Sequence, residues 1–289
     1  MQQSQSKKQI PLKSTTIKND QWDISFPDQT PLFWPILPVY QQLEKAPTIW
    51  PTLIEYNHLI SGCIKNNNNK NILFVEQGDQ CLSFEEEYEP KIFLAGEVQT
   101  RLNNWHDFFQ VMVWKTFPKT KALLNQIHYE AAVDRNKTGE KQRSKKENFV
   151  TLFDECGSLI ISSNENILTL VKEFEWDNFF IQNKTEFGKT IDCVVFGHAM
   201  YEKALTPYIG MTSHCLLIQV EARYFTLSTH EKTEYLDKAI VSHICEITEL
   251  NTKNLTPLPI LGIPNWYDDQ SSVFYKNKTY FRTGRNKKT

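Results

Sequence analysis

The sequence predicts an α+β fold, a single domain with several helices packed on a small, mainly antiparallel sheet. Apolar residues recur at helical spacing in some segments and form short strand-like runs in others, without the regular βαβ alternation of a parallel sheet. Hydrophobic residues make up 40% of the 289 residues, enough for a substantial core. We expect the domain to span residues 31–281, between a polar, disordered N-terminal tail (1–30) and a basic C-terminal tail (282–289).

The first hundred residues predict short elements. Residues 31–62 carry two short helices separated by prolines, which limit helix length. Two interpretations fit the asparagine-rich residues 66–70, a solvated loop or a segment that recognises a partner. The apolar residues 72–75 that follow are a candidate strand.

The next segment predicts two consecutive helices. Asn104 is placed to cap the first helix. Apolar side chains surround this helix on nearly every side, which predicts that it is buried. These side chains are Trp105, Phe108, Phe109, Val111, Met112, Val113 and Trp114. Pro118 should end or kink the helix, and a second helix should continue toward Ala132.

The second half of the chain supplies the expected strands. Residues 149–153 and 159–161 are rich in β-forming types and flank a link that contains Gly157, a pattern that predicts a β-hairpin. Further strands are expected at residues 191–196 and 214–220.

Two further helices are expected around these strands. One begins at His198 and extends to about Leu205. The other is opened by Ser228 and Glu231, which have capping-box spacing. Its inner face carries Leu236, Ala239, Ile240, His243, Ile244 and Ile247. From residue 257 onward the chain is rich in proline and aromatic residues, and we expect irregular structure.

Composition argues against several classes of function. The formal net charge of −2 offers no global attraction to nucleic acid or to acidic membranes. We find no apolar run for a signal peptide or a membrane span, so we expect a cytoplasmic protein without a membrane partner. The six cysteines form no C-x-x-C pair, which favours buried free thiols in a reducing cytosol. Without a G-x-S-x-G motif or a phosphate-cradling glycine loop, a standard serine hydrolase, P-loop NTPase or Rossmann dehydrogenase is not expected.

His106 and Asp107 stand in the first turn of the helix that follows Asn104. One interpretation is structural: Asp107 caps backbone N–H groups and His106 is a buried imidazole bonded to a carbonyl. The other is functional. Because the helix dipole disfavours an imidazolium at this end, a neutral His106 is suited to act as a general base or metal ligand, with Asp107 orienting it or contacting the metal.

His198 and Glu202 are a second pair of candidates. They follow an expected strand and stand at i and i+4, on one face of a helix. Such a pair can hold one divalent metal ion, act as an acid–base pair or form a simple surface pair. The spacing resembles half of a zinc site, but the H-E-x-x-H motif is absent.

Four other residues are weaker candidates. His214 starts an apolar strand and is either a third imidazole of the site or a structural residue. His243 lies on the apolar face of its helix, so we interpret it as a core histidine. Asp154 and Glu155 fall on the expected hairpin link. They form either a solvated turn or a pair of carboxylates for acid–base chemistry or cation binding. Adjacent residues on a strand point to opposite faces, which argues against that pair.

A basic segment separates the expected helices and strands. Between residues 134 and 147 the chain carries Arg135, Lys137, Lys141, Arg143, Lys145 and Lys146, partly offset by Asp134, Glu140 and Glu147. The simple interpretation is a solvated loop. Alternatively, the segment contacts phosphate groups or nucleic acid, although it has no interleaved aromatic residues for base stacking.

These motifs together resemble the bacterial family labelled domain of unknown function 3025. The resemblance is carried by residues 104–109 with Trp114, 152–155 with Gly157, 196–199 with Glu202, and 257–264 with Trp266, and it covers roughly residues 31–281. Asn265 departs from the family pattern, where a small glycine is expected. The resemblance implies a bacterial, cytosolic protein that forms one continuous unit, and it implies no reaction, cofactor or catalytic residue.

Three hypotheses about function follow. The first is a hydrolytic enzyme with His106, Asp107, His198 and Glu202 as catalytic residues, in which His106, His198 and Glu202 bind a divalent metal and an unidentified small molecule is the substrate. The second is a non-catalytic binding module that contacts phosphate-bearing partners such as RNA through residues 135–146. The third is structural, with each histidine buried and separately satisfied. The first requires the side chains of His106 and His198 to lie within roughly 8 Å of each other.

Overall fold

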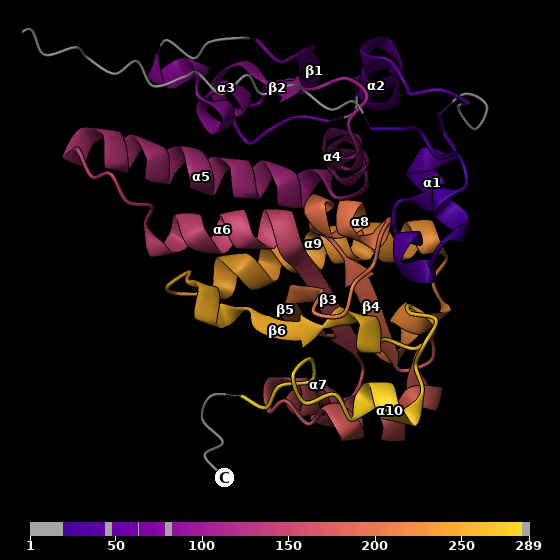
Figure 1. Ribbon diagram of the computed structural model, residues 1–289. Helices are drawn as coiled ribbons and strands as arrows, with labels where there is room; N and C mark the ends of the chain where they lie inside the picture. Colours follow the sequence, from indigo (N-terminus) through magenta and orange to yellow (C-terminus); the bar gives the residue numbers. More distant parts are fainter. Residues whose placement is uncertain (1–19, 44–47, 63, 79–82, 285–289) are drawn as a thin grey trace, which may run out of the picture.

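The protein has an α+β fold, as predicted. The computed structural model describes residues 20–43, 48–62, 64–78 and 83–284 (Figure 1). In chain order, the helices and strands are α1 (Leu37–Tyr40), α2 (Leu53–Ile60), β1 (Leu73–Glu76), α3 (Tyr88–Ala95), β2 (Glu97–Thr100), α4 (Trp105–Thr116), α5 (Pro118–Thr138), α6 (Lys145–Cys156), β3 (Gly157–Ser162), α7 (Glu165–Lys172), β4 (Ile191–Val195), α8 (His198–Ala204), β5 (Thr212–Gln219), α9 (Thr229–Glu246), β6 (Thr256–Pro259) and α10 (Ser272–Tyr275). In these described ranges, no helix combines the length and apolar character needed to span a membrane.

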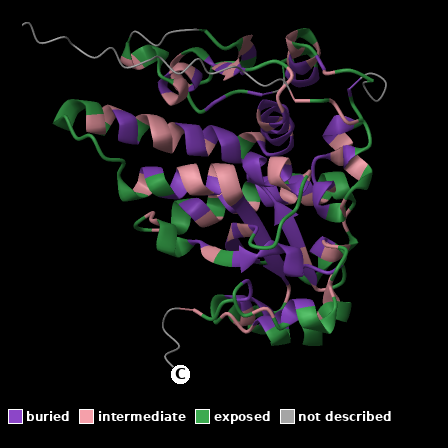
Figure 2. Ribbon diagram, viewed as in Figure 1, coloured by how far each residue is buried: buried purple, intermediate pink, exposed green. Residues whose placement is uncertain are grey.

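The elements stack in layers. Figure 1 shows α2, α3, β1 and β2 on one side of α4 and α5, with α6, α8 and α9 between these helices and the four-stranded sheet. Helices α7 and α10 lie beyond the sheet, at the opposite end of the molecule. The buried residues follow the middle layers, where the helices meet each other and the sheet (Figure 2).

The main sheet has the strand order β4-β3-β5-β6. Strand β3 is antiparallel to β4 and parallel to β5, and β5 is antiparallel to β6. The pairing is therefore mainly antiparallel, as predicted, but the parallel β3–β5 pair was not predicted. Every residue of β3 is buried, as is typical of a central strand covered on both faces. A separate parallel pair, β1 and β2, lies in the N-terminal layer.

The predicted hairpin at residues 149–161 is wrong, because residues 149–153 belong to helix α6, which passes directly into β3. Phe149, Val150 and Phe153 are buried at helical spacing along one face. The helix is opened by a capping box in which Ser144 N–H donates to Glu147 and Glu147 N–H donates back to Ser144 Oγ. Asp154 and Glu155 therefore stand on the last turn of a helix rather than on a hairpin link.

The N-terminal boundary predicted at residue 31 also differs from the packing. Phe26 is fully buried, with its ring centroid 5.3 Å from that of Trp105. The Asp20 carboxylate accepts a hydrogen bond from Trp105 N–H at 3.0 Å. Residues 20–30 thus cover the start of α4. The remainder of the predicted N-terminal tail, and residues 285–289 of the C-terminal one, lie outside the described residues.

Helix α4 follows the prediction closely. Asn104 is its N-cap, with Oδ1 accepting from Asp107 N–H at 3.1 Å. The helix ends at Thr116, and Pro118 begins α5. Pro118 suits this position because the first residues of a helix need no N–H partner within it.

The carboxylate of Asp237 on α9 caps the N-terminal end of α5. Its carboxylate accepts hydrogen bonds from Lys119 N–H at 3.0 Å and Thr120 N–H at 2.8 Å.

We expect Asp237→Ala to lower the free energy of unfolding by about 2 kcal/mol, because two N–H groups at a helix start lose their acceptor. Urea denaturation tests this, with Lys238→Ala on the exposed face of α9 as a control that should change stability by less than about 0.5 kcal/mol. Equal stabilities of the two variants would contradict the assigned cap.

Asn265, which stands where the family resemblance led us to expect glycine, has a left-handed backbone with φ of 68°. Asparagine tolerates this conformation better than most residues with a side chain. Its N–H donates to Gln270 Oε1 at 2.9 Å, which holds the turn. The left-handed turn is therefore retained without glycine.

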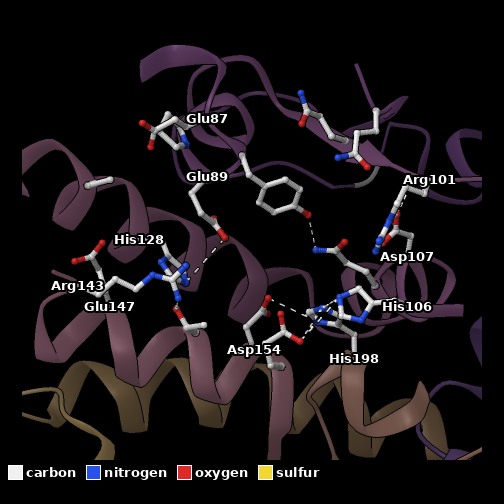
Figure 3. Close-up of a pocket in the computed structure, with 18 of the residues that line it drawn as sticks. Glu87, Glu89, Arg101, His106, Asp107, His128, Arg143, Glu147, Asp154 and His198 are labelled. Atoms are coloured by element: carbon white, nitrogen blue, oxygen red, sulfur yellow. Dashed lines mark hydrogen bonds and ion pairs between the residues drawn. The ribbon is translucent and has the colours of Figure 1, made fainter. Parts of the chain in front are cut away.

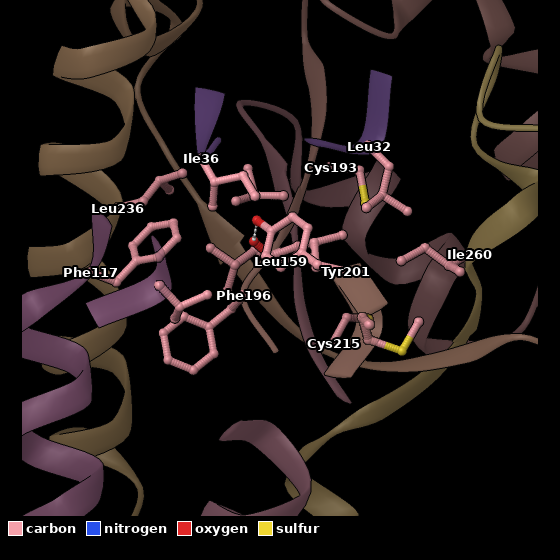
Figure 4. Close-up of a cluster of buried hydrophobic side chains, with 14 of the residues drawn as sticks. Leu32, Ile36, Phe117, Leu159, Cys193, Phe196, Tyr201, Cys215, Leu236 and Ile260 are labelled. Atoms are coloured by element: carbon pink, nitrogen blue, oxygen red, sulfur yellow. Dashed lines mark hydrogen bonds between the residues drawn. The ribbon is translucent and has the colours of Figure 1, made fainter. Parts of the chain in front are cut away.

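The core encloses two of the cysteines. Figure 4 shows Cys193 and Cys215 among apolar side chains, with Tyr201 at the centre. Burial raises the pKa of both thiols, which keeps them protonated and unreactive. Cys156 is half-buried and Cys245 is exposed, and these four cysteines are free. Buried free thiols were thus predicted correctly for Cys193 and Cys215.

Candidate functional site

The register of the sheet brings the first two side chains of the site together. Ser158 on β3 lies opposite Val195 on β4. Continued three residues outward, this antiparallel register places Glu155, on the last turn of α6, beside His198, at the start of α8. The junction is fixed by Gly157, whose carbonyl accepts from Phe196 N–H at 3.0 Å and from Gly197 N–H at 2.8 Å.

His106 reaches the same point from α4, which packs against α8. Phe109 and Tyr201 stack across this contact at 5.6 Å between ring centroids. His106 and His198 each precede one of these aromatic residues by three positions, so they share its helix face. Their rings are nearly perpendicular, and the two Nε2 atoms are 3.0 Å apart (Figure 3). The convergence required by the first hypothesis is therefore present.

A carboxylate lies at the outer nitrogen of each imidazole. Glu202 Oε2 is 2.8 Å from His106 Nδ1, and Asp154 Oδ2 is 3.7 Å from His198 Nδ1. The hydrogen bond to Glu202 favours a proton on His106 Nδ1, which leaves the lone pair of a neutral ring on Nε2. Asp154 is beyond hydrogen-bond distance of His198 Nδ1, and its charge favours the same tautomer of His198 electrostatically. Two such lone pairs facing each other at 3.0 Å repel unless a proton or a cation lies between them.

The Glu155 carboxylate lies near the same point and could act as a third ligand. Its Oε2 is 3.7 Å from His198 Nε2 and 3.9 Å from His106 Nε2. A triangle with sides of 3.0, 3.7 and 3.9 Å has its circumcentre about 2.1 Å from each corner. This distance matches the usual bond from zinc to imidazole nitrogen or carboxylate oxygen. These three residues could therefore hold one metal ion.

Burial controls the charges around this centre. It lowers the pKa of His198 to about 3, so the ring is neutral near pH 7. For His106, burial opposes the charged form, but the hydrogen bond to Glu202 and the carboxylate of Glu155 outweigh it and raise the pKa. Burial raises the pKa of Glu155.

Lys121 keeps Asp154 ionised behind His198. Burial would raise the pKa of Asp154, but the nearby Lys121 ammonium and His198 outweigh it and lower the pKa. Lys121 Nζ donates to both carboxylate oxygens, at 2.6 and 2.8 Å, and its own side chain is only 5% exposed. A buried lysine with this partner fixes the Asp154 carboxylate beside the imidazole.

The His106–Glu155–His198 centre opens on a pocket of about 420 Å³, a size typical of small-molecule sites. Figure 3 shows the two histidines at one end and Arg143, His128 and Glu147 at the other. The walls come from α3, α4, α5 and α6. On the α3 side, the Tyr88 hydroxyl accepts a hydrogen bond from Gln110 Nε2 at 2.6 Å.

Two of the predicted site residues occupy positions other than those predicted. Asp107 binds the guanidinium of Arg101 at 2.9 and 3.0 Å, so its carboxylate does not orient His106. Glu202 was expected to bind a metal or to act in an acid–base pair. It contacts the outer nitrogen of His106, whereas the carboxylate near both Nε2 atoms is that of Glu155.

The two remaining histidine candidates lie outside the site. His214 is a half-buried residue of β5, and burial together with Lys203 lowers its pKa. It does not belong to the group of ligand atoms formed by His106, Glu155 and His198. His243 on α9 is half-buried rather than enclosed in the core.

Sequence reasoning undervalued Glu155 and overlooked Lys121. Glu155 was discounted because the hairpin prediction placed it on a strand. The capping-box spacing of Ser144 and Glu147 was the available signal, since it marks a helix start and places Glu155 on the final turn of that helix. For Lys121, the sequence offers no comparable local signal.

The basic segment is not a continuous loop. Arg135 and Lys137 belong to α5, and Lys145 and Lys146 to α6. Arg135 is paired with Glu147, and Lys145 with Glu249. Only residues 139–144 connect the two helices, so the six basic side chains do not form one uninterrupted patch.

Comparison with known proteins identifies a family. No curated protein and no solved structure matches the chain. The family model described as "Protein of unknown function (DUF3025)" matches residues 72–285, which include His106, Glu155 and His198. Because this match covers well over half of the chain, the protein belongs to that family, as the resemblance in its sequence implied.

Proposed function

We propose that the protein is a metal-dependent hydrolase whose divalent ion is held by His106, His198 and Glu155. The observation that carries this proposal is the single point about 2.1 Å from the two Nε2 atoms and Glu155 Oε2. Two imidazoles and one carboxylate are a ligand set of catalytic zinc sites, which leave a further position for water or substrate.

The surroundings of the three ligands support the same proposal. Metal-binding histidines usually direct their other ring nitrogen toward a carboxylate or carbonyl, which fixes the tautomer. Glu202 meets this requirement for His106, and Asp154 lies on the corresponding side of His198. Lys121 in turn holds Asp154 in place. A set of separately satisfied structural histidines would not require paired Nε2 atoms.

The chemistry follows from the site and its pocket. When bound, a zinc-like ion acts as a Lewis acid that brings the pKa of water toward neutrality and polarises a carbonyl or phosphoryl oxygen. Neutral His198 is suited to bind a cation as it stands, whereas His106, whose pKa is raised, would give up its Nε2 proton when the ion binds. Tyr88, Gln110 and the Arg101–Asp107 pair provide polar groups along the wall for positioning a substrate.

Metal titration tests the proposal. Metal-depleted protein should bind one Zn²⁺ or Mn²⁺ per chain by calorimetry, and His106→Ala should lose this binding. His214→Ala, which removes a histidine outside the site, should bind like the wild type. The loaded protein should hydrolyse members of a panel of chromogenic esters and phosphate esters, and a chelator should abolish that activity.

Two results would contradict the proposal. One is wild-type protein that binds no stoichiometric ion, or His106→Ala protein that binds as well as wild type. The other is hydrolysis that survives the chelator but is lost in His106→Ala, which would identify His106 and Glu202 as a metal-free base pair.

A further inference from the structure

Among the residues that the structure describes, one arginine of the pocket has no acidic partner. Three arginines line it, and two are neutralised: Arg101 by Asp107 and Arg135 by Glu147. Arg143 forms no ion pair with any residue that the structure describes. Its guanidinium donates a long hydrogen bond of 3.5 Å from Nη1 to Thr151 Oγ1.

The contact with Thr151 places the Arg143 guanidinium in the same pocket as the His106–Glu155–His198 centre, at the opposite end from the two histidines (Figure 3). Arg143 precedes α6, and its side chain folds back along the helix to Thr151. Thr151 and Glu155 are four residues apart on the same helix, which is a rise of about 6 Å on one face. Thr151 is therefore one helical turn from Glu155, and the guanidinium that contacts Thr151 lies beyond it in the same pocket.

We infer that the substrate carries an anionic group, a phosphate or a carboxylate, that Arg143 binds while the reacting bond lies at the His106–Glu155–His198 centre. The placement of the reacting bond at the His106–Glu155–His198 centre rests on the proposed function. A guanidinium is suited to this task because its planar N–H groups match two oxygens of either anion. A pocket of about 420 Å³ that is lined by both Arg143 and the His106–Glu155–His198 centre fits a compact acidic molecule rather than a polymer.

The acidic residues of the pocket constrain where the anion binds. Glu89 and Glu87 line the α3 side, opposite Arg143. Glu89 accepts from Asn125 Nδ2 at 2.8 Å and lies 4.0 Å from His128, whereas Glu87 is exposed. These carboxylates repel an anion from the α3 wall. On the α6 wall, Glu147 is paired with Arg135 and Asp154 with Lys121, so two of its carboxylates are neutralised and the Arg143 guanidinium is left to attract the anion.

This inference gives one member of the basic segment a role at the pocket. The neighbouring Lys145 is engaged with Glu249 at 2.8 Å and does not line the pocket. Arg143 and Lys145 are two residues apart, carry the same charge and are both exposed. Their replacement by glutamine therefore provides a matched pair of variants.

The test is an NMR titration with inorganic phosphate and, separately, with acetate. The titration uses protein that also carries His106→Ala and His198→Ala, so that no metal ion at the centre can bind the anion. Arg143→Gln should weaken binding by about tenfold, the effect of losing a charge-assisted hydrogen-bond pair, and Lys145→Gln should leave it unchanged. Preference for phosphate identifies a phosphate-bearing substrate, and comparable or stronger acetate binding identifies a carboxylate-bearing one.

Three outcomes would overturn the inference: neither anion binds, Arg143→Gln binds as well as its parent, or Lys145→Gln weakens binding equally. Salt-sensitive RNA binding that falls equally in both glutamine variants would instead indicate a nucleic-acid partner. The metal titration is independent of these results. Anion binding that persists when the wild type binds no metal refutes only the proposed function, and metal binding without an Arg143-dependent anion refutes only this inference.

Discussion

Glu155→Gln should weaken metal binding by more than about 100-fold, whereas Glu202→Gln should weaken it by about 10- to 100-fold. Glutamine preserves the shape of glutamate but removes the charge that attracts a cation. Under the proposed function, the charge of Glu155 lies on the third atom of the ligand triangle, so its loss would remove a bond to the ion. In Glu202 it lies behind His106, where its loss relaxes the tautomer and the ring orientation.

The two glutamates form a well-matched pair for this experiment. Their side chains are 41% and 43% exposed, so neither substitution should affect the core. Competition with a chelator gives the metal affinity, and thermal unfolding of metal-free protein checks that both variants fold. The opposite order, with Glu202→Gln the more damaging, would show that Glu202 rather than Glu155 binds the ion.

Gly197→Ala should disrupt the site and destabilise the fold by about 3 kcal/mol. A Cβ at residue 197 would lie 2.4 Å from the Glu155 carbonyl oxygen, 2.5 Å from its carbonyl carbon and 2.5 Å from Gly157 N. All three are backbone atoms, which cannot rotate away. The start of α8 must therefore move away from the end of α6, separating His198 from Glu155.

Urea denaturation and metal titration together measure both consequences. Gly78→Ala is a suitable control, because a Cβ there meets nothing within 4 Å and the backbone is not left-handed. It should change neither property. Wild-type stability and metal affinity in Gly197→Ala would mean that the α6–α8 junction is looser than the structure indicates, and would remove the explanation for how Glu155 and His198 meet.

The sequence by itself determined the features that depend on neighbouring residues. Asn104 caps α4 because its side chain reaches an N–H three residues away. Pro118 separates two helices because it lacks an N–H, and Ser228 with Glu231 opens α9 through a capping box. The apolar stripe that follows His106 likewise predicted a buried helix, and His106 and His198 were both identified as candidates.

Local signals were ambiguous where the same residues suit two structures. Residues 149–153 are β-branched and aromatic enough for a strand, yet they bury one face at helical spacing within α6. Packing of that face against the core stabilises the helix, and the helix in turn determines the position of Glu155. A run of five residues cannot by itself distinguish the two periods.

Only the tertiary structure decided which side chains form the site. The pairing of β3 with β4 sets Glu155 beside His198, and the packing of α4 on α8 brings His106 to both. Asp107, next to His106 in sequence, instead turns to Arg101. The physical reason is one of range: caps and helix faces act over three or four residues, whereas strand register and helix packing relate side chains that the sequence separates by tens of positions.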